Sequence, residues 1–478
     1  MFVVFVGGIA YVKWYKKNVL DKIEDAFSKG YDPALELAEQ QHKKPLKQGE
    51  EGAEGPWTRS LRRREQKKID KIVHGQEAGH YFVLLGPKGS GKGTMIFDSM
   101  AAIRADGVSM CDAHPDLEVF RLRLGKALNY EFNEDSQTGL FQRRDPREGC
   151  GPALDIERAM NKLEKVALRS ARKTGKPLVL IINNVHFFNN DEAGRNMLLQ
   201  LQSRAEGWAA SGILTMVFSS DDFWPFQVLR KNASRMHVLS ITDLNNSEAR
   251  DALNRLRSCN RNLTSPPEEI EKAISLVGGR LAYLNRVSKC KDMIQMAEHL
   301  MAVEKGWLLS QIGLIPDCDD DVMDEQKWSS CSWLLLQEFV KIREEKEKER
   351  QAALEAGTID LEHDKGVGLP SIPYWRCRQI MTRADFLEDL DRANIISIDI
   401  NHNVRPDSML ILRSAQEVVS QEGFDDMLDG VRNRIDEIEG LHRTRELTFK
   451  DVDKGDRIQL SVDKGGAALI ETLLGPPS

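Results

Sequence analysis

A run of nine residues in the first quarter of the chain has the types and spacing of a phosphate-binding loop. The run is Gly86, Pro87, Lys88, Gly89, Ser90, Gly91, Lys92, Gly93 and Thr94. Its glycines let consecutive backbone N–H groups converge on phosphate oxygens, which side chains at those positions would obstruct. Lys92 can reach the β- and γ-phosphates of a nucleotide. The pattern therefore predicts a cradle for ATP.

The hydroxyl that would bind Mg²⁺ lies one place later than usual in this loop. Gly93 follows Lys92, and Thr94 comes next. Gly-Lys-Gly-Thr is an accepted variant of the motif, so Thr94 is the predicted Mg²⁺ ligand. The competing interpretation is a glycine-rich turn that holds no ligand.

The flanking stretches favour the phosphate loop over a plain turn. Residues 81–85 are an apolar run that predicts a buried strand, and the residues after the loop predict a helix. This order places phosphates at the positive end of a helix dipole. Further apolar runs predict strands, with helices between them, at residues 107–112, 177–184, 212–218 and 236–241. The alternation predicts an α/β fold with a parallel P-loop sheet.

Two asparagines stand where P-loop ATPases carry acids. The apolar run at 177–184 ends in Asn183 and Asn184. An acid at the first position holds Mg²⁺ through water, and the next acid polarises the attacking water. Asparagine accepts hydrogen bonds but brings no negative charge and takes no proton. Hydrolysis is therefore expected to be weak. Asp191 and Glu192 follow, and they favour a helix start over a replacement role.

Other polar residues are candidates for sensing the γ-phosphate. Ser219, with Ser220 beside it, follows the 212–218 strand, although a plain strand-end turn fits nearly as well. Arg280 follows two glycines at a helix start, and Arg286 is the alternative sensor. If the protein oligomerises, a neighbouring copy could supply an arginine-finger residue. The sequence does not choose among the candidates Arg230, Lys231 and Arg235.

The last third of the chain predicts a winged-helix domain. Helices are expected at 374–381 and, capped by Thr382, at 383–392, followed by strands at 395–400 and 409–412 joined by a turn. The helix at 383–392 carries the acids Asp385, Glu388, Asp389 and Asp391. Acidic groups repel a phosphate backbone, so a protein-contact or lid role is expected there and nucleic acid is not.

The N-terminus has the pattern of a membrane-interface segment. Residues 1–12 are apolar, an aromatic pair follows at Trp14 and Tyr15, and lysines flank it. The run is shorter than the roughly 20 residues of a spanning helix. A partial anchor in residues 1–17 and a buried terminal helix or strand both remain open.

Composition sets broad limits on the function. The net charge of -7 argues against a general nucleic-acid binder, although it leaves a local basic patch open. The seven cysteines form no C-x-x-C pair. The sequence therefore indicates neither a zinc site nor a disulfide framework. The expected order is a hydrophobic segment (1–17), helix and linker (18–58), nucleotide domain (59–245), helical lid (246–316), winged helix (325–415), and helix and tail (416–478).

These features together resemble the AAA-like and STAND-type ATPases, and more closely the fungal AAA-type proteins with a C-terminal winged helix. The yeast mitochondrial escape protein family looks similar. The resemblance rests on the phosphate loop from Gly86 to Lys92 and on the turn from Val277 to Leu281. It implies a nucleotide domain, a helical lid, ATP as ligand and a location at the mitochondrial inner membrane. That family carries an acid at Asn183.

Three functions are consistent with these features. The first is a membrane-associated, ATP-binding switch or scaffold that hydrolyses weakly or not at all and controls a protein partner. The second is an active, oligomeric AAA-type ATPase. The third is a small-molecule phosphotransferase, which ranks last because arginine-rich substrate and lid motifs are not found.

Overall fold

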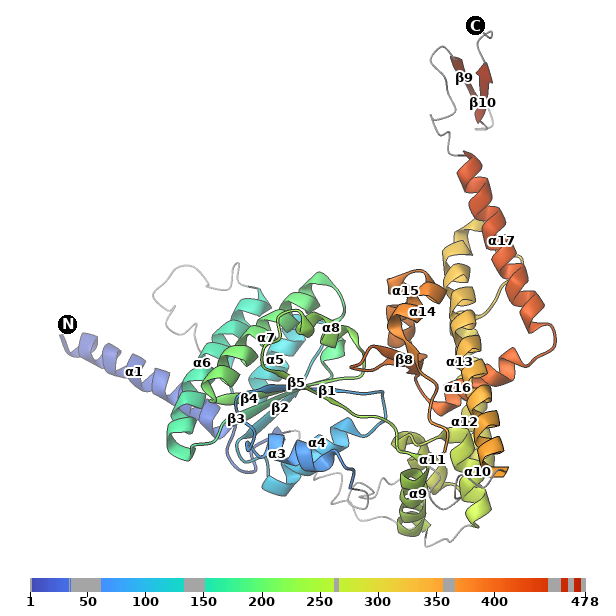
Figure 1. Ribbon diagram of the computed structural model, residues 1–478. Helices are drawn as coiled ribbons and strands as arrows, with labels where there is room; N and C mark the ends of the chain where they lie inside the picture. Colours follow the sequence, from blue (N-terminus) through green and yellow to red (C-terminus); the bar gives the residue numbers. More distant parts are fainter. Residues whose placement is uncertain are drawn as a thin grey trace. The chain divides into compact units, whose positions relative to one another are not determined.

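The computed structural model describes residues 2–33, 35, 62–132, 151–261, 266–355, 366–445, 457–462 and 468–473 (Figure 1). The predicted linker within 18–58 lies largely outside these residues. Two compact units emerge. The larger holds Met1–Gln311 and Cys331–Gln421, and the smaller holds Ile312–Ser330 and Glu422–Ser478.

A five-stranded parallel sheet forms the centre of the nucleotide domain. Its strands, in chain order, are β1 (Tyr81–Leu85), β2 (Val108–Asp112), β3 (Leu178–Asn183), β4 (Leu214–Ser220) and β5 (Met236–Ser240). Their spatial order is β2-β3-β4-β1-β5, so β4 lies between the strand before the phosphate loop and the strand that ends in asparagine. The predicted parallel sheet is confirmed.

Helices cover both faces of this sheet (Figure 1). Alternate strand residues face α3 and α4 on one side and α1, α5, α6 and α7 on the other. Burial on both faces explains why the strands are continuous apolar runs. The helices are α1 (Phe2–Asp25), α3 (Gln66–Val73), α4 (Lys92–Ile103), α5 (Leu117–Ala127), α6 (Pro152–Thr174), α7 (Glu192–Ser211) and α8 (Trp224–Arg230), with the 3-10 turn η3 (Val185–Phe188).

Helix α1 belongs in part to this core. Val19, Ile23 and Phe27, at its C-terminal end and just beyond it, are buried, and Arg169 of α6 bonds Asp21 at 2.5 Å. Toward its start, Tyr11 and Trp14 are 54% and 60% exposed. Among the described residues, no helix is both long enough and apolar enough to cross a membrane.

A lid of four helices follows the sheet. These are α9 (Asn246–Arg261), α10 (Pro267–Val277), α11 (Leu281–Lys289) and α12 (Met293–Ile312). Leu410, from much later in the chain, is buried in the same apolar cluster. The lid is therefore packed against the winged-helix region.

The winged-helix region contains α13 (Met323–Glu355), α14 (Tyr374–Met381) and α15 (Ala384–Arg392). Its wing is the antiparallel sheet β6-β8-β7, made of β6 (Ile372–Pro373), β7 (Ile396–Ile398) and β8 (Asn403–Pro406).

The turn predicted between the two wing strands contains strand β8, and two further sequence predictions in this region are wrong. Residues 409–412 are not a strand but the start of helix α16 (Met409–Val419). The Ser408 hydroxyl accepts from the Ile411 N–H at 3.2 Å, so a helix N-cap overrides the strand-like apolar run. Thr382 does not cap α15, because it has a φ of 62° and Arg383 takes the N-cap position.

The smaller unit has its own apolar cluster. Val431, Ile435 and Ile438 of α17 (Phe424–Arg445) pack with Cys318, close to η4 (Asp320–Val322). The last described elements are two antiparallel strands, β9 (Arg457–Val462) and β10 (Ala468–Leu473), which pair as a hairpin. The sequence did not predict this hairpin.

Candidate nucleotide site

The phosphate loop joins β1 to α4 in the conformation that its glycines permit. Gly89 and Gly91 have φ values of 79° and 99°, where side chains are strained. A Cβ on Gly89 would lie 2.8 Å from Ala282 Cβ, and one on Gly91 would lie 2.9 Å from Leu281 Cδ1. The start of α11 therefore forms one wall of the loop.

Lys92 is the first residue of α4, and its side chain is buried. Its ammonium donates to the carbonyl of Pro87 at 2.9 Å, and it pairs with Asp221 Oδ1 at 2.7 Å. Burial lowers the pKa of Lys92, and the Asp221 carboxylate opposes that shift. Asp221 therefore occupies the place at which a phosphate oxygen would meet the lysine.

The loop fits a phosphate ligand on an independent observation. The Ser90 hydroxyl is buried and has no hydrogen-bond partner among the described residues. A buried polar atom without a partner costs free energy unless a ligand or water satisfies it. Thr94 lies in the first turn of α4 and is partly exposed. The residues present therefore suit the phosphates of a nucleotide, with Thr94 as the hydroxyl for Mg²⁺.

At the end of β3, an acid lies beside the first asparagine. The Asn183 amide donates to Asp112 Oδ1 at 2.8 Å, and Asp112 ends the neighbouring strand β2. Asn184 has a left-handed backbone, with a φ of 55°, and is the N-cap residue of η3. The sequence prediction had no means of pairing Asp112 with Asn183, because the two lie far apart along the chain.

Next to the predicted Ser219 and Ser220, at the end of β4, the structure adds Asp221 and His186 to the site. Ser219 and Ser220 are buried, and the Ser220 hydroxyl donates to the carbonyl of Asp222 at 2.7 Å. The following residue, Asp221, donates its backbone N–H to His186 Nδ1 at 3.2 Å. Asp221 was visible as an acid at a strand end, whereas nothing in the sequence pattern singled out His186.

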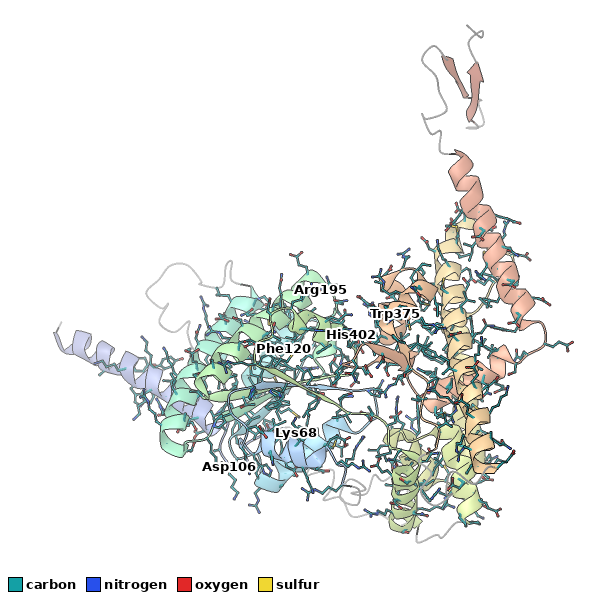
Figure 2. All side chains as sticks on the ribbon, in the orientation of Figure 1. Lys68, Asp106, Phe120, Arg195, Trp375 and His402 are labelled. Carbon is teal, nitrogen blue, oxygen red and sulfur yellow. The ribbon has the colours of Figure 1, made fainter. Side chains whose placement is uncertain are left out.

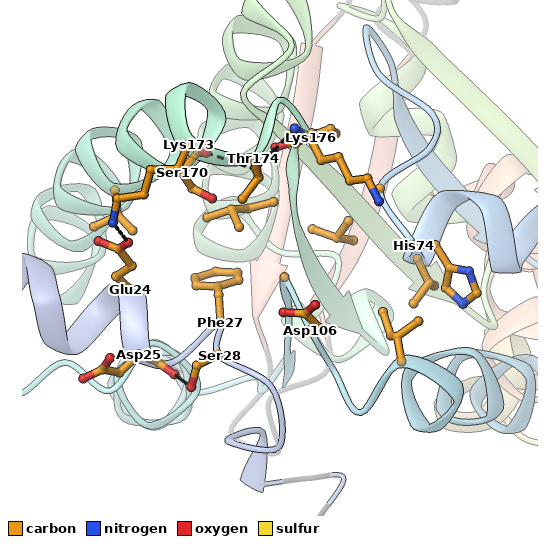
Figure 3. Close-up of a pocket in the computed structure, with 18 of the residues that line it drawn as sticks. Glu24, Asp25, Phe27, Ser28, His74, Asp106, Ser170, Lys173, Thr174 and Lys176 are labelled. Carbon is orange, nitrogen blue, oxygen red and sulfur yellow. Dashed lines mark hydrogen bonds and ion pairs between the residues drawn. The ribbon is translucent and has the colours of Figure 1, made fainter.

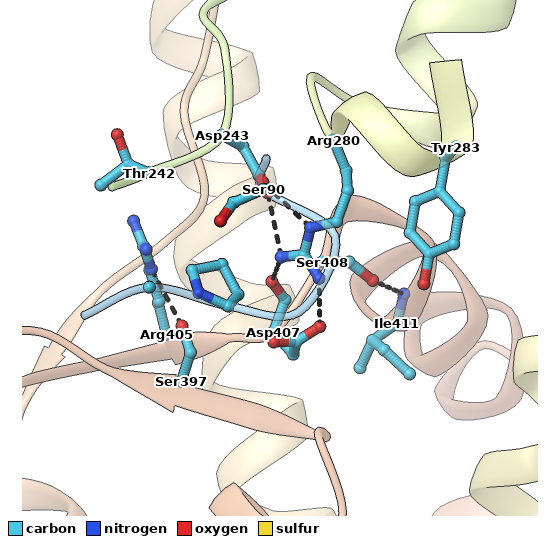
Figure 4. A network of polar contacts seen from close by, with 12 residues as sticks. Ser90, Thr242, Asp243, Arg280, Tyr283, Ser397, Arg405, Asp407, Ser408 and Ile411 are labelled. Carbon is cyan, nitrogen blue, oxygen red and sulfur yellow. Dashed lines mark hydrogen bonds and ion pairs between the residues drawn. The ribbon is translucent and has the colours of Figure 1, made fainter. Parts of the chain in front are cut away.

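Arg280 lies against the phosphate loop, but its guanidinium points to two acids (Figure 4). It donates to Asp243 at 2.9 Å, and it bonds both the carboxylate and the carbonyl of Asp407 in the turn before α16. Burial alone would lower the pKa of Arg280, but the two carboxylates outweigh it and raise the pKa. The guanidinium thus stays charged and joins the loop wall to the winged-helix region.

Helix α15 and the wing also contact the nucleotide domain. Asp391 Oδ2 accepts from the backbone N–H of Phe223 at 2.7 Å, and Glu388 accepts from Asn190 at 3.0 Å. His402, labelled in Figure 2, lies edge-on to Phe223 with ring centroids 5.4 Å apart. Part of the acidic surface predicted for a protein contact is therefore used within the chain.

The arginine-finger candidates have different surroundings. Arg230 contacts His402 of the wing, and Arg235 donates to the carbonyl of Gly79 at 3.4 Å. Lys231 and Arg286 are exposed. Because a finger acts from a neighbouring copy, which finger and which sensor operate stays a prediction.

Two cavities help to delimit the site. One, of about 580 Å³, opens beside the loop and is lined by Lys88, His186, Asp221 and Arg392, among others. The other, of about 680 Å³ (Figure 3), is lined by Phe27, Gly107 and other residues at the opposite ends of the strands. Ligands of open parallel sheets bind at the carboxyl ends of strands, so the first cavity is the one next to the nucleotide site.

A comparison with protein families supports the architecture. Residues 309–439 match the model of the fungal AAA protein C-terminal winged helix domain. The chain is similar to fungal AAA proteins. The match confirms the resemblance predicted from the sequence, and the parallel sheet with its loop gives an AAA-type, P-loop ATPase-like fold. No match was found among curated proteins.

Three solved structures are similar to parts of the chain. The Walker-type ATPase paby2304 of Pyrococcus abyssi is 12% identical, with 74% of this chain and 95% of its own covered, at a TM-score of 0.45. The ORC1 protein of Aeropyrum pernix, in complex with DNA, is 11% identical. The match covers 76% of this chain and 94% of that chain, at a TM-score of 0.34. Domain III of the Thermotoga maritima replication initiation protein DnaA is 14% identical. The match covers 48% of this chain and 82% of that chain, at a TM-score of 0.29. All three TM-scores lie below 0.5.

Proposed function

We propose that this fungal AAA-like protein is an ATP-binding switch that hydrolyses ATP weakly. The observation that carries the proposal is the phosphate loop itself, with Lys92 buried at the start of α4 and Arg280 fixed against the loop wall. ATP would be held by Gly86, Pro87, Lys88, Gly89, Ser90, Gly91, Lys92, Gly93 and Thr94. When it is bound, Mg²⁺ would offset phosphate charge beside Thr94.

Coupling to the winged helix follows from competition for charged groups. Phosphate oxygens and Asp221 compete for Lys92, and phosphate oxygens and Asp407 compete for Arg280. A ligand shifts an equilibrium only by its differential affinity for the two arrangements. Nucleotide binding would therefore weaken the link between Arg280 and Asp407 and change how the winged helix is held. A protein partner would read that change.

Weak hydrolysis follows from the residues at the end of β3. Asn183 and Asn184 bring no charge to Mg²⁺-bound water and accept no proton. Ser219 on β4 and Arg280 on α11 stay the proposed γ-phosphate sensors. An active, oligomeric ATPase is the alternative, and it requires turnover that rises with protein concentration.

Membrane association is the second part of the proposal. The exposed Tyr11 and Trp14 are followed by Lys16 and Lys17, a pattern suited to the interface of a bilayer. Residues 1–17 would then associate with the mitochondrial inner membrane. A fluorescent fusion that keeps its membrane fraction after high-salt washing supports this part, and a fusion lacking residues 1–17 should lose it.

The deciding experiment compares nucleotide binding and turnover on one preparation. Wild type should show an ATP-dependent rise in Tm, and Lys92→Ala should abolish it. Lys176→Ala is the matched control, because Lys176 is an exposed lysine at the opposite ends of the strands. Equal rises in Lys92→Ala and wild type would disprove the nucleotide site. Wild-type turnover at ordinary ATPase rates would disprove weak hydrolysis.

A further inference from the structure

We propose that Asp221 is the general base for the residual ATP hydrolysis, supplying the carboxylate that the end of β3 lacks. The inference rests on the proposed ATP binding and assigns the reaction step that Asn183 and Asn184 leave open. It is carried by three observations: the position of Asp221 in the sheet, its ion pair with Lys92, and the cavity that it lines.

The strand order places Asp221 between the phosphate loop and the two asparagines. It directly follows β4, which lies between β1 and β3. The Gly86 N–H donates to the Ser220 carbonyl at 3.4 Å, which ties the end of β4 to the start of the loop. A carboxylate here therefore lies next to the phosphate loop.

The ion pair shows that the Asp221 carboxylate reaches the phosphate-binding lysine. Asp221 Oδ1 lies 2.7 Å from Lys92 Nζ, and the Asp221 side chain is 17% exposed. Phosphate oxygens would attract Lys92 away from the carboxylate. The freed carboxylate would then lie next to the γ-phosphate with an oxygen free to accept a proton.

His186 holds Asp221 in place and leaves it the proton-accepting role. His186 Nδ1 accepts the backbone N–H of Asp221, so the proton of a neutral ring lies on Nε2. His186 Nε2 faces Asp221 Oδ2 at 4.0 Å. Burial lowers the pKa of His186, which favours this neutral form. The ring therefore presents a donor to the carboxylate and has no free acceptor for water.

The neighbouring cavity gives the attacking water a place. Its volume is about 580 Å³, and Asp221, His186 and Lys88 all line it. Asp191 and Asp222 also line it. Asp112, an acid beside Asn183, ends β2, the edge strand beyond β3, and already accepts the Asn183 amide. The geometry therefore favours Asp221 over Asp112.

Hydrolysis by this route needs no reagent other than ATP and water. The water oxygen forms a bond to the γ-phosphorus as the bond from that phosphorus to the β–γ bridging oxygen breaks. One water proton moves to the Asp221 carboxylate and later to solvent. ADP and inorganic phosphate are the products, and Asp221 returns to its ionised form.

The test compares Asp221→Asn with Asp112→Asn and wild type in the full chain. Phosphate release and ATP affinity, with Mg²⁺ and with EDTA, are measured on each. Asp221→Asn should lower turnover about 10²-fold, within the usual range for a general base. It should also bind ATP at least as tightly as wild type, because Lys92 loses its competing partner. Asp112→Asn should keep turnover near the wild-type rate.

Each other outcome overturns the inference. Unchanged turnover in Asp221→Asn makes Asp221 only the counter-ion of Lys92, and weaker ATP binding in that variant makes it a structural support. A larger loss in Asp112→Asn transfers the role to Asp112. If wild type binds ATP but shows no turnover, Asp221 has no reaction to catalyse, and the proposed ATP-binding switch still holds. A wild type that does not bind ATP contradicts the proposed function itself.

Discussion

Arg280, at the start of α11, and Asp407, in the turn before α16, form a buried ion pair between the lid and the winged-helix region. Breaking a buried pair from one side leaves an uncompensated charge, which costs about 3–5 kcal/mol. Arg280→Ala should therefore lower the free energy of unfolding by that amount, because both Asp243 and Asp407 lose their partner. Urea unfolding measures the change.

Asp407→Asn is the milder comparison at the same contact. An amide oxygen still accepts from the Arg280 guanidinium, and Asp243 still neutralises the charge. The loss should be clearly smaller than in Arg280→Ala, and limited proteolysis should cut the winged-helix region sooner in both variants. Equal stability of Arg280→Ala and wild type would show that the pair does not hold the winged helix.

Restoring an acid on β3 should have a cost that the sequence alone did not show. Asn183→Asp replaces the amide that donates to Asp112 at 2.8 Å with a second carboxylate. Stability at pH 8 should fall by about 1.5–3 kcal/mol, the usual value of a hydrogen bond to a charged group. The loss should shrink at low pH, where one carboxyl of the pair becomes protonated.

The swapped variant Asp112→Asn with Asn183→Asp is the control for that loss. It re-forms the hydrogen bond between an amide and a carboxylate, with the donor now at position 112 and the acceptor at position 183, and should recover most of the stability. Turnover measured in parallel should rise in Asn183→Asp with Asn184→Glu if the missing acids limit hydrolysis. No rise in turnover would mean that Asn183 and Asn184 do not limit hydrolysis.

The two loop glycines can be tested against a third that has free space. Gly89→Ala forces a side chain into a φ of 79° and within 2.8 Å of Ala282, which should cost about 1–3 kcal/mol. Gly93→Ala meets no described atom within 4 Å and should raise Tm slightly, because alanine favours a helix. Tm without nucleotide checks both expectations. Equal Tm values would mean that α11 does not form the wall.

The nucleotide-domain sheet was predictable because its strands are apolar runs buried on both faces, with the loop fixing one strand–helix junction. The second wing strand was not, since four apolar residues at 409–412 suit a strand or a helix equally. Ser408 was the available signal, because serine just before an apolar run is a common helix start.

The site was predictable only in its local part. Gly86 to Thr94 are contiguous, so their motif can be read directly from the sequence. The contacts from Asn183 to Asp112 and from Lys92 to Asp221 join residues far apart in the chain. Such pairs depend on strand order, and no periodicity in a single sequence specifies that order. Arg280 was identified by its turn, but Asp407, its partner in the winged helix, could come only from the tertiary structure.

Asp222 should make stability fall as the pH rises toward neutrality. Burial, together with the nearby Asp221 charge, raises its pKa to about 7, well above the value of about 3.9 in an unfolded chain. Between these values the folded protein keeps a proton that the unfolded chain has released, so rising pH disfavours the fold. Asp222→Asn removes this penalty and should be stabilised relative to wild type by up to about 4 kcal/mol more at pH 8 than at pH 4. Urea unfolding at both pH values measures the difference, and the same relative stability at both would show that folding does not raise the pKa of Asp222.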